Sequence, residues 1–209
     1  MKFVLLVIVT FLSPSLKADP GVFDRGNGGD VVFCRSEQGK SQYLLLDIYE
    51  QRNMGFHRWQ PSLPEDYTFH EVLEAVFSRI DQKLPYLASK LREEYFGRFA
   101  QDLTFVAPED VPDVDDQGPV ILEPHCNLKQ IAVQWSEKSK YGKAYRIDIT
   151  LFSLLDPYNQ GALILHELIY RIKLSADMLM ESSQDVRTNV SYILSKEFDQ
   201  FPGYNPSSY

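Results

Sequence analysis

The chain contains only two cysteines, Cys34 and Cys126, and the start of the sequence indicates which compartment they meet. The segment Met1–Ala18 carries a positive residue, Lys2, then an apolar run and a Ser-Pro-Ser break before a small residue. This pattern predicts a secretory signal peptide over residues 1–18, because the apolar run is far shorter than the roughly 20 residues that span a bilayer. We therefore expect both cysteines to reach an oxidising environment.

A single disulfide between Cys34 and Cys126 is the expected outcome. It would join positions 92 apart in the sequence, and the loop-entropy model assigns a closure of that size about 4 to 5 kcal/mol of stabilisation. The alternative is a reactive thiol or a metal-ligating pair. Neither cysteine sits in a Cys-x-x-Cys motif or beside a basic cluster that would lower its pKa, which favours the disulfide.

The mature chain, residues 19–209, is expected to be one acidic domain that works in the periplasm or is secreted. Loss of Lys2 and Lys17 leaves 19 basic against 29 acidic residues, a formal net charge of −10. Because phosphate binding needs a basic face and the chain has no Lys/Arg-rich run, this charge argues against a nucleic-acid partner. No later segment approaches 18 consecutive apolar residues, so we expect no transmembrane segment after signal cleavage.

The patterning predicts an α+β fold, with an antiparallel sheet of about five strands, an inserted helical hairpin and two C-terminal helices on the sheet. Alternation of Ile147, Ile149 and Leu151 is typical of a sheet face. The strands are expected at 30–34, 41–50, 119–123, 129–136 and 144–152. A capping box formed by Thr68 and Glu71 opens the hairpin. The helices are expected at about 69–82, from Pro85, from Asp156–Pro157 to about Leu174, and at about 183–197.

The candidate catalytic or ligand-binding residues lie on the first of the two C-terminal helices. At 100° per residue, His166, Glu167, Tyr170 and Arg171 gather opposite an apolar stripe. His-Glu is the first half of His-Glu-x-x-His, in which two histidines hold zinc and the Glu acts as general base. Tyr170 stands where the second histidine would be, so a zinc site would have to recruit His125 or a carboxylate from another element.

A structural interpretation of the same helix face stays open beside the catalytic one. Glu167 and Arg171 are in the favourable i, i+4 order for an ion pair, and His166 can pack on Tyr170 one turn later. A polar site without a metal is a further alternative.

Several segments of the mature chain resemble a group of small exported proteins of Gram-negative bacteria. The segments are Gly26–Asp30 leading to Cys34, Leu45–Glu50, Cys126 with Gln130 and Ala132, Ala162–Arg171, and Ser182–Ser183 with Val186–Arg187. The resemblance carries no particular activity. It implies that the helix with His166 and the segment with Arg187 belong to one pattern, so that Arg187 faces the same pocket.

Two classes of function follow from these observations. The first is a binding or envelope-associated protein, whose polar helix face is structural or holds an anionic ligand through Arg171 and Arg187. The second is a hydrolase acting on an envelope polymer or peptide, with Glu167 as general base and His166 as ligand or acid/base partner. The expected partner is an envelope polymer, peptide or protein. No cofactor is expected except zinc in the second class, with His166 and His125 as candidate ligands.

Overall fold

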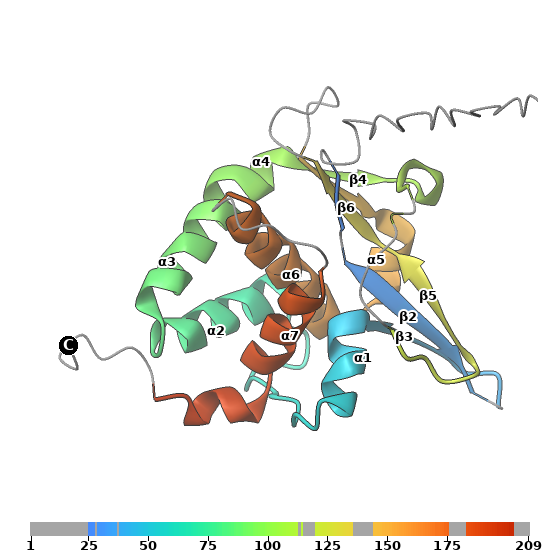
Figure 1. Cartoon of the computed structure of the whole chain (residues 1–209), viewed down its shortest axis with the longest axis horizontal. Helices are drawn as coiled ribbons and strands as arrows, with labels where there is room; N and C mark the ends of the chain where they lie inside the picture. The colour runs from blue at the N-terminus through green and yellow to red at the C-terminus, as the bar shows by residue number, and fades with distance from the viewer. Residues whose placement is uncertain are drawn as a thin grey trace, which may run out of the picture.

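The computed structural model describes residues 25–27, 29–36, 38–112, 114, 120–135, 144–175 and 183–202 of the 209-residue chain. The predicted signal peptide, residues 1–18, lies outside these described residues. In the described part, most helices gather on one side of the molecule and the strands on the other, with α5 beside the strands, so the α+β class is confirmed (Figure 1). None of the described helices is long and apolar enough to cross a membrane.

Within the described residues, strands and helices follow each other in blocks: β1–β3, then α1–α4, then β4–β7, then α5–α7. The strands are β1 (Arg25–Asn27), β2 (Asp30–Arg35), β3 (Ser41–Leu45), β4 (Leu103–Val106), β5 (Cys126–Gln130), β6 (Ala132–Trp135) and β7 (Tyr145–Asp148). The α-helices are α1 (Leu46–Asn53), α2 (Phe69–Asp81), α3 (Pro85–Glu94), α4 (Ala100–Asp102), α5 (Ile149–Leu154), α6 (Pro157–Ser175) and α7 (Gln184–Ile193). A π-helical turn (Tyr95–Phe99) follows α3, and 3₁₀ turns lie at Pro108–Asp110 and Lys196–Gln200.

The strands form two small sheets, so the prediction of one antiparallel sheet of about five strands is wrong. One sheet has the order β1-β6-β7-β4, in which β4 runs parallel to β7 and the other neighbours are antiparallel. The second sheet, β3-β2-β5, is antiparallel throughout. The sheets meet where β5 passes into β6. There the carbonyl of Gly29 accepts hydrogen bonds from the backbone N–H groups of Ile131 and Ala132.

Two predicted strands are shorter than expected because a helix begins inside each of them. The Asp148 carboxylate accepts hydrogen bonds from the N–H groups of Thr150 and Leu151, and this N-cap ends β7 and starts α5. The predicted strand 41–50 ends at Leu45, since the rest of its apolar run forms the buried helix α1. A short apolar run without alternation fits a buried helix as well as a strand. Residues 120–123 form no strand, and β4 was not predicted.

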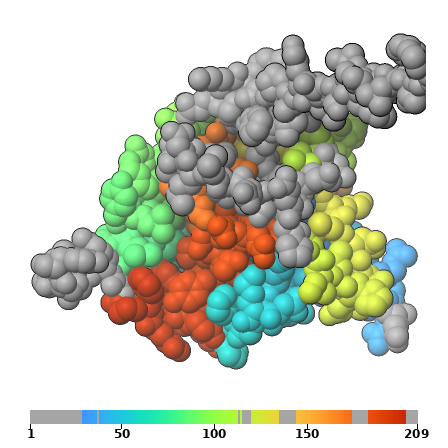
Figure 2. Space-filling view, in the orientation of Figure 1, coloured from blue at the N-terminus to red at the C-terminus, as the bar shows by residue number. Residues whose placement is uncertain are grey.

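The predicted helical hairpin is confirmed in both of its helices. Thr68 and Glu71 form the capping box of α2, and Pro85 occupies the first turn of α3. The helix expected from Asp156–Pro157 is α6, which packs against α2, α3 and β3. The last helix, α7, packs on α1 and α6 instead of on a sheet, and α1 and α7 lie side by side on the face shown in Figure 2.

The core is divided between the two sides of the three-stranded sheet. The larger apolar cluster is formed by the helices together with β6 and β7. A smaller cluster contains Val32, Leu44, Leu46, Tyr49 and Cys126. The predicted disulfide is confirmed at the edge of this smaller cluster, where Cys34 on β2 and Cys126 on β5 are directly opposite residues.

Arg79 on α2 binds the segment from the end of α7 to the 3₁₀ turn that follows it. Its side chain is 7% exposed and donates hydrogen bonds to the carbonyls of Ile193 and Ser195. The guanidinium also pairs with the carboxylate of Asp199 and lies over the rings of Trp59 and Phe198, with its carbon 4.5 and 5.0 Å from the ring centroids. One residue thus joins α2 to α7 and to the 3₁₀ turn that follows.

We expect Arg79→Met to lower the free energy of unfolding by about 2 to 3 kcal/mol, since it leaves buried carbonyls without their donor. Urea unfolding followed by circular dichroism measures the change. The control is Lys90→Met on the neighbouring helix, whose partner Glu93 is exposed and whose ion pair contributes less than about 1 kcal/mol. If the two variants lost equal free energy of unfolding, the buried contacts of Arg79 would not be what holds α7 and the following turn to α2.

Candidate functional site

The four polar residues predicted on one face of α6 lie together, and they face the interior of the protein. The exposed fractions are 1% for His166, 0% for Glu167, 5% for Tyr170 and 4% for Arg171. The helix is buried on all sides from Ala162 to Arg171. Each polar group therefore needs a protein partner, because a buried polar group without one costs free energy.

His166 is paired with Asp47, which the sequence analysis did not identify. Nδ1 of His166 lies 2.8 and 3.2 Å from the two carboxylate oxygens of Asp47, a residue of α1 that is itself fully buried. The imidazole also lies parallel to the ring of Tyr170, as expected for residues one turn apart. Nε2 of His166 is buried and has no hydrogen-bond partner among the described residues.

The charges around His166 favour its protonated form. Burial opposes protonation, but the carboxylate of Asp47, with weaker contributions from Glu167 and Asp30, raises the pKa of His166 to about 8. His166 is then a buried cation with a carboxylate on one side.

Glu167 joins α6 to both sheets. Its carboxylate accepts a 2.8 Å hydrogen bond from the N–H of Gly29 and a 2.7 Å hydrogen bond from Nε2 of Gln134 on β6. The same Nε2 also donates to the backbone carbonyl of Glu167. Burial raises the pKa of Glu167, although the His166 cation and these donors act in the opposite direction.

A side chain on Gly29 would force the buried Leu163 side chain to shift. A Cβ atom there would lie 2.2 Å from Cδ1 of Leu163, inside the contact distance of two carbon atoms. The shift would occur beside the hydrogen bond that the Gly29 N–H donates to the Glu167 carboxylate. This gives a physical reason for the last glycine of the Gly26–Asp30 segment.

The two arginines of the predicted site are bound to different elements. Nε of Arg171 donates to the hydroxyl of Tyr145 on β7, which in turn donates to Glu94 at the end of α3. Nε of Arg187 on α7 donates to the carboxylate of Glu50, at 2.8 Å. Arg187 also donates to the Ser183 hydroxyl.

Asp47 and Glu50 place His166 and Arg187 against the same short helix. The two acidic residues are three positions apart on α1 and so share a face. Asp47 receives the ring of His166 from α6, and Glu50 receives Arg187 from α7. The available signal was a pair of acidic residues, Asp47 and Glu50, three positions apart in the largely apolar run 41–50. It was missed because the run was read as a strand, in which these residues would point to opposite faces.

The two candidate zinc ligands lie in different environments. His166 is in the core, whereas the side chain of His125 is 52% exposed in the turn before β5, with Nε2 at 3.3 Å from the carboxylate of Glu123. Across the part of the chain that the structure describes, one group of three metal-ligand side chains occurs, formed by Glu123, His125 and Cys126. His166 belongs to no such group there.

The arrangement around His166 is that of a histidine oriented by a carboxylate. In catalytic and metal sites, the same geometry leaves Nε2 to act as a base or as a ligand. In this protein the pair is covered by α1, α6 and Tyr170. Compared with protein-family models, curated proteins and solved structures, the chain matches none.

The raised pKa of His166 predicts a stability that falls with increasing pH. The folded state binds the proton more tightly than the unfolded state, whose histidine has a pKa near 6.5, so the contribution is complete below about pH 6.5 and is lost as the pH rises through about 8. We expect a loss of about 2 kcal/mol between those limits. Urea unfolding at a series of pH values measures it, and a His166→Leu variant with the same decline would contradict the assignment.

Proposed function

We propose that the chain is an exported protein of the periplasm or the extracellular space that binds an envelope polymer, peptide or protein partner. The observation that supports this most is the burial of His166, Glu167, Tyr170, Arg171 and Arg187, none more than 5% exposed. Partners on α1, β6 and β7 occupy the groups that a hydrolase would present to its substrate. The polar face of α6 then holds the fold together, and binding uses other surfaces.

The compartment is supported by two independent observations. The sequence begins with a segment that has the pattern of a secretory signal peptide. The disulfide between Cys34 and Cys126 is consistent with a location outside the cytoplasm, where such bonds persist.

The second candidate is a hydrolase, with or without a metal, and the unpartnered Nε2 of His166 favours it. With Asp47 on Nδ1, this nitrogen is in the position of a general acid while the ring is protonated and of a base or ligand once the proton has left, and Glu167 is the adjacent residue. This function requires the covering of α6 to open and admit a substrate. Binding at other surfaces requires no such opening, so the observed structure supports it better than hydrolysis.

Incubation of the mature chain with purified cell-wall sacculi, and separately with outer-membrane vesicles, separates the two functions. We expect saturable co-sedimentation with one of these fractions and no release of soluble fragments. An unrelated protein of similar negative charge serves as the control for nonspecific binding. Fragment release by the wild type that is lost in a folded Glu167→Gln variant would instead support the hydrolase, and co-sedimentation no greater than that of the control would contradict the binding function.

A further inference from the structure

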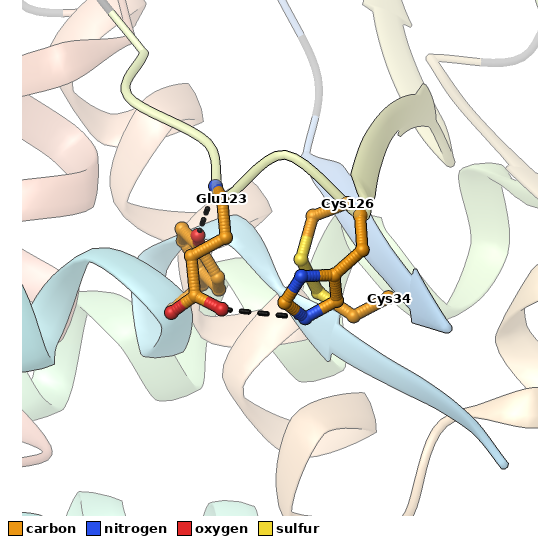
Figure 3. The surroundings of a disulfide bond; sticks show 5 residues. Cys34, Glu123 and Cys126 are labelled. Carbon is orange, nitrogen blue, oxygen red and sulfur yellow. Dashed lines mark hydrogen bonds and ion pairs between the residues drawn. A yellow bond between two sulfur atoms is a disulfide. The ribbon is translucent and has the colours of Figure 1, made fainter. Parts of the chain in front are cut away.

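The turn before β5 brings metal-ligand side chains to the disulfide. One ligand atom each of Glu123, His125 and Cys126 lie within 4.8 Å of one another, and the sulfur of Cys34 is bonded to that of Cys126. Figure 3 shows Glu123 beside the disulfide of Cys34 and Cys126, and the carboxylate of Glu123 lies 3.3 Å from Nε2 of His125. Four side chains from two strands and one turn therefore converge at one place.

Hydrogen bonds that do not involve the sulfur atoms hold this turn in shape. The N–H of Cys126 donates to the carbonyl of Glu123 across the turn, at 2.9 Å. The N–H of Glu123 donates to the hydroxyl of Tyr49, and the N–H of Arg35 donates to the carbonyl of His125. The positions of His125 and Glu123 thus depend on the backbone and on α1, and these contacts do not require the disulfide.

In the oxidised protein this cluster has too few ligands for a metal. Sulfur atoms joined in a disulfide are not thiolates, which leaves only the imidazole of His125 and the carboxylate of Glu123. Structural zinc sites use four ligands in tetrahedral geometry, with nitrogen and thiolate sulfur preferred. Two free thiolates would complete such a set.

We propose that reduction of the disulfide creates a zinc site formed by Cys34, Cys126, His125 and Glu123. A dithiol reductant supplies two electrons and two protons, so the sulfur–sulfur bond breaks, two thiols form and the reductant becomes a disulfide. Zn²⁺ then binds both sulfur atoms as thiolates, and the two thiol protons pass to solvent. The metal replaces the covalent bond as the link between β2 and β5.

The chemistry of the four side chains selects zinc over the hard cations. Thiolate and imidazole suit zinc, whereas magnesium and calcium take oxygen ligands. The side chains of His125 and Glu123 are 52% and 63% exposed, so an ion reaches them from solvent. After reduction the sulfur atoms separate by side-chain rotation to the distance of about 3.7 Å that zinc–sulfur bonds of about 2.3 Å require in a tetrahedron.

The test is a zinc titration of the mature chain, reduced with a phosphine that does not compete for the metal, against a chromophoric chelator. We expect the reduced protein to bind one equivalent and the oxidised protein to bind none at the same concentration. His125→Ala should weaken binding at least about tenfold. The matched control is His57→Ala, which removes another exposed histidine paired with a glutamate and should leave the affinity unchanged. Equal affinity of the His125→Ala and wild-type proteins would overturn the proposal, as would a reduced wild type that binds no zinc.

A second measurement applies if the reduced chain does not stay folded. Zinc bound by the native geometry stabilises the folded state over the unfolded one. We then expect added zinc to restore the circular dichroism of the reduced wild type but not of a Cys34→Ser/Cys126→Ser variant. Restoration in both proteins, or in neither, contradicts a site built from these thiolates.

Discussion

The ion pair between Asp47 on α1 and His166 on α6 fixes the position of the three-stranded sheet relative to the central helix α6. Helix α1 has only eight residues and follows β3 directly, so it is too short to be stable alone and takes its position from tertiary contacts. Asp47 supplies two of them, because its carboxylate binds His166 on α6 and its backbone carbonyl accepts the hydroxyl of Ser191 on α7. Because α1 follows β3 without a loop, the position of α1 also determines the position of β3 and of the three-stranded sheet.

The other polar residues of α6 extend the same scheme to different parts of the fold. Glu167 reaches the junction of the two sheets at Gly29 and, through Gln134, strand β6. Arg171 reaches Tyr145 on β7. A buried pair contributes little net stability compared with an apolar replacement, but loss of one partner is costly. The pattern His-Glu-x-x-Tyr-Arg is therefore explained by the need to fix one central helix to three neighbours.

Local signals in the sequence predicted the helices better than the strands. The capping box at Thr68, Pro85 in a first turn and Asp156 before Pro157 each act through neighbouring backbone groups, so a short window contains all the information. The segment 41–50 lacked such a signal, since its apolar run fits either a strand or a buried helix. Asp148 was an available N-cap signal that the alternation after it concealed.

The residues of the candidate site on α6 could be predicted from the sequence, but most of their partners could not. His166, Glu167 and Arg171 lie on one helix, so their spacing alone placed them together. Asp47, Gly29 and Gln134 come from segments 33 to 138 positions away in sequence, and pairings at that distance depend on the tertiary fold. Burial of the group was hidden for the same reason, because a polar helix face is normally the one exposed to water.

A double-mutant cycle on Asp47 and His166 tests the central claim most directly. The free energies of unfolding of Asp47→Leu, His166→Leu and the double variant are measured near pH 6, where the histidine of the folded protein is charged. A structural pair buried in the core predicts that the double variant is more stable than the sum of the single losses allows, with a coupling of about 1 to 3 kcal/mol. Strictly additive losses would contradict the account, because they would mean that the two side chains do not support each other.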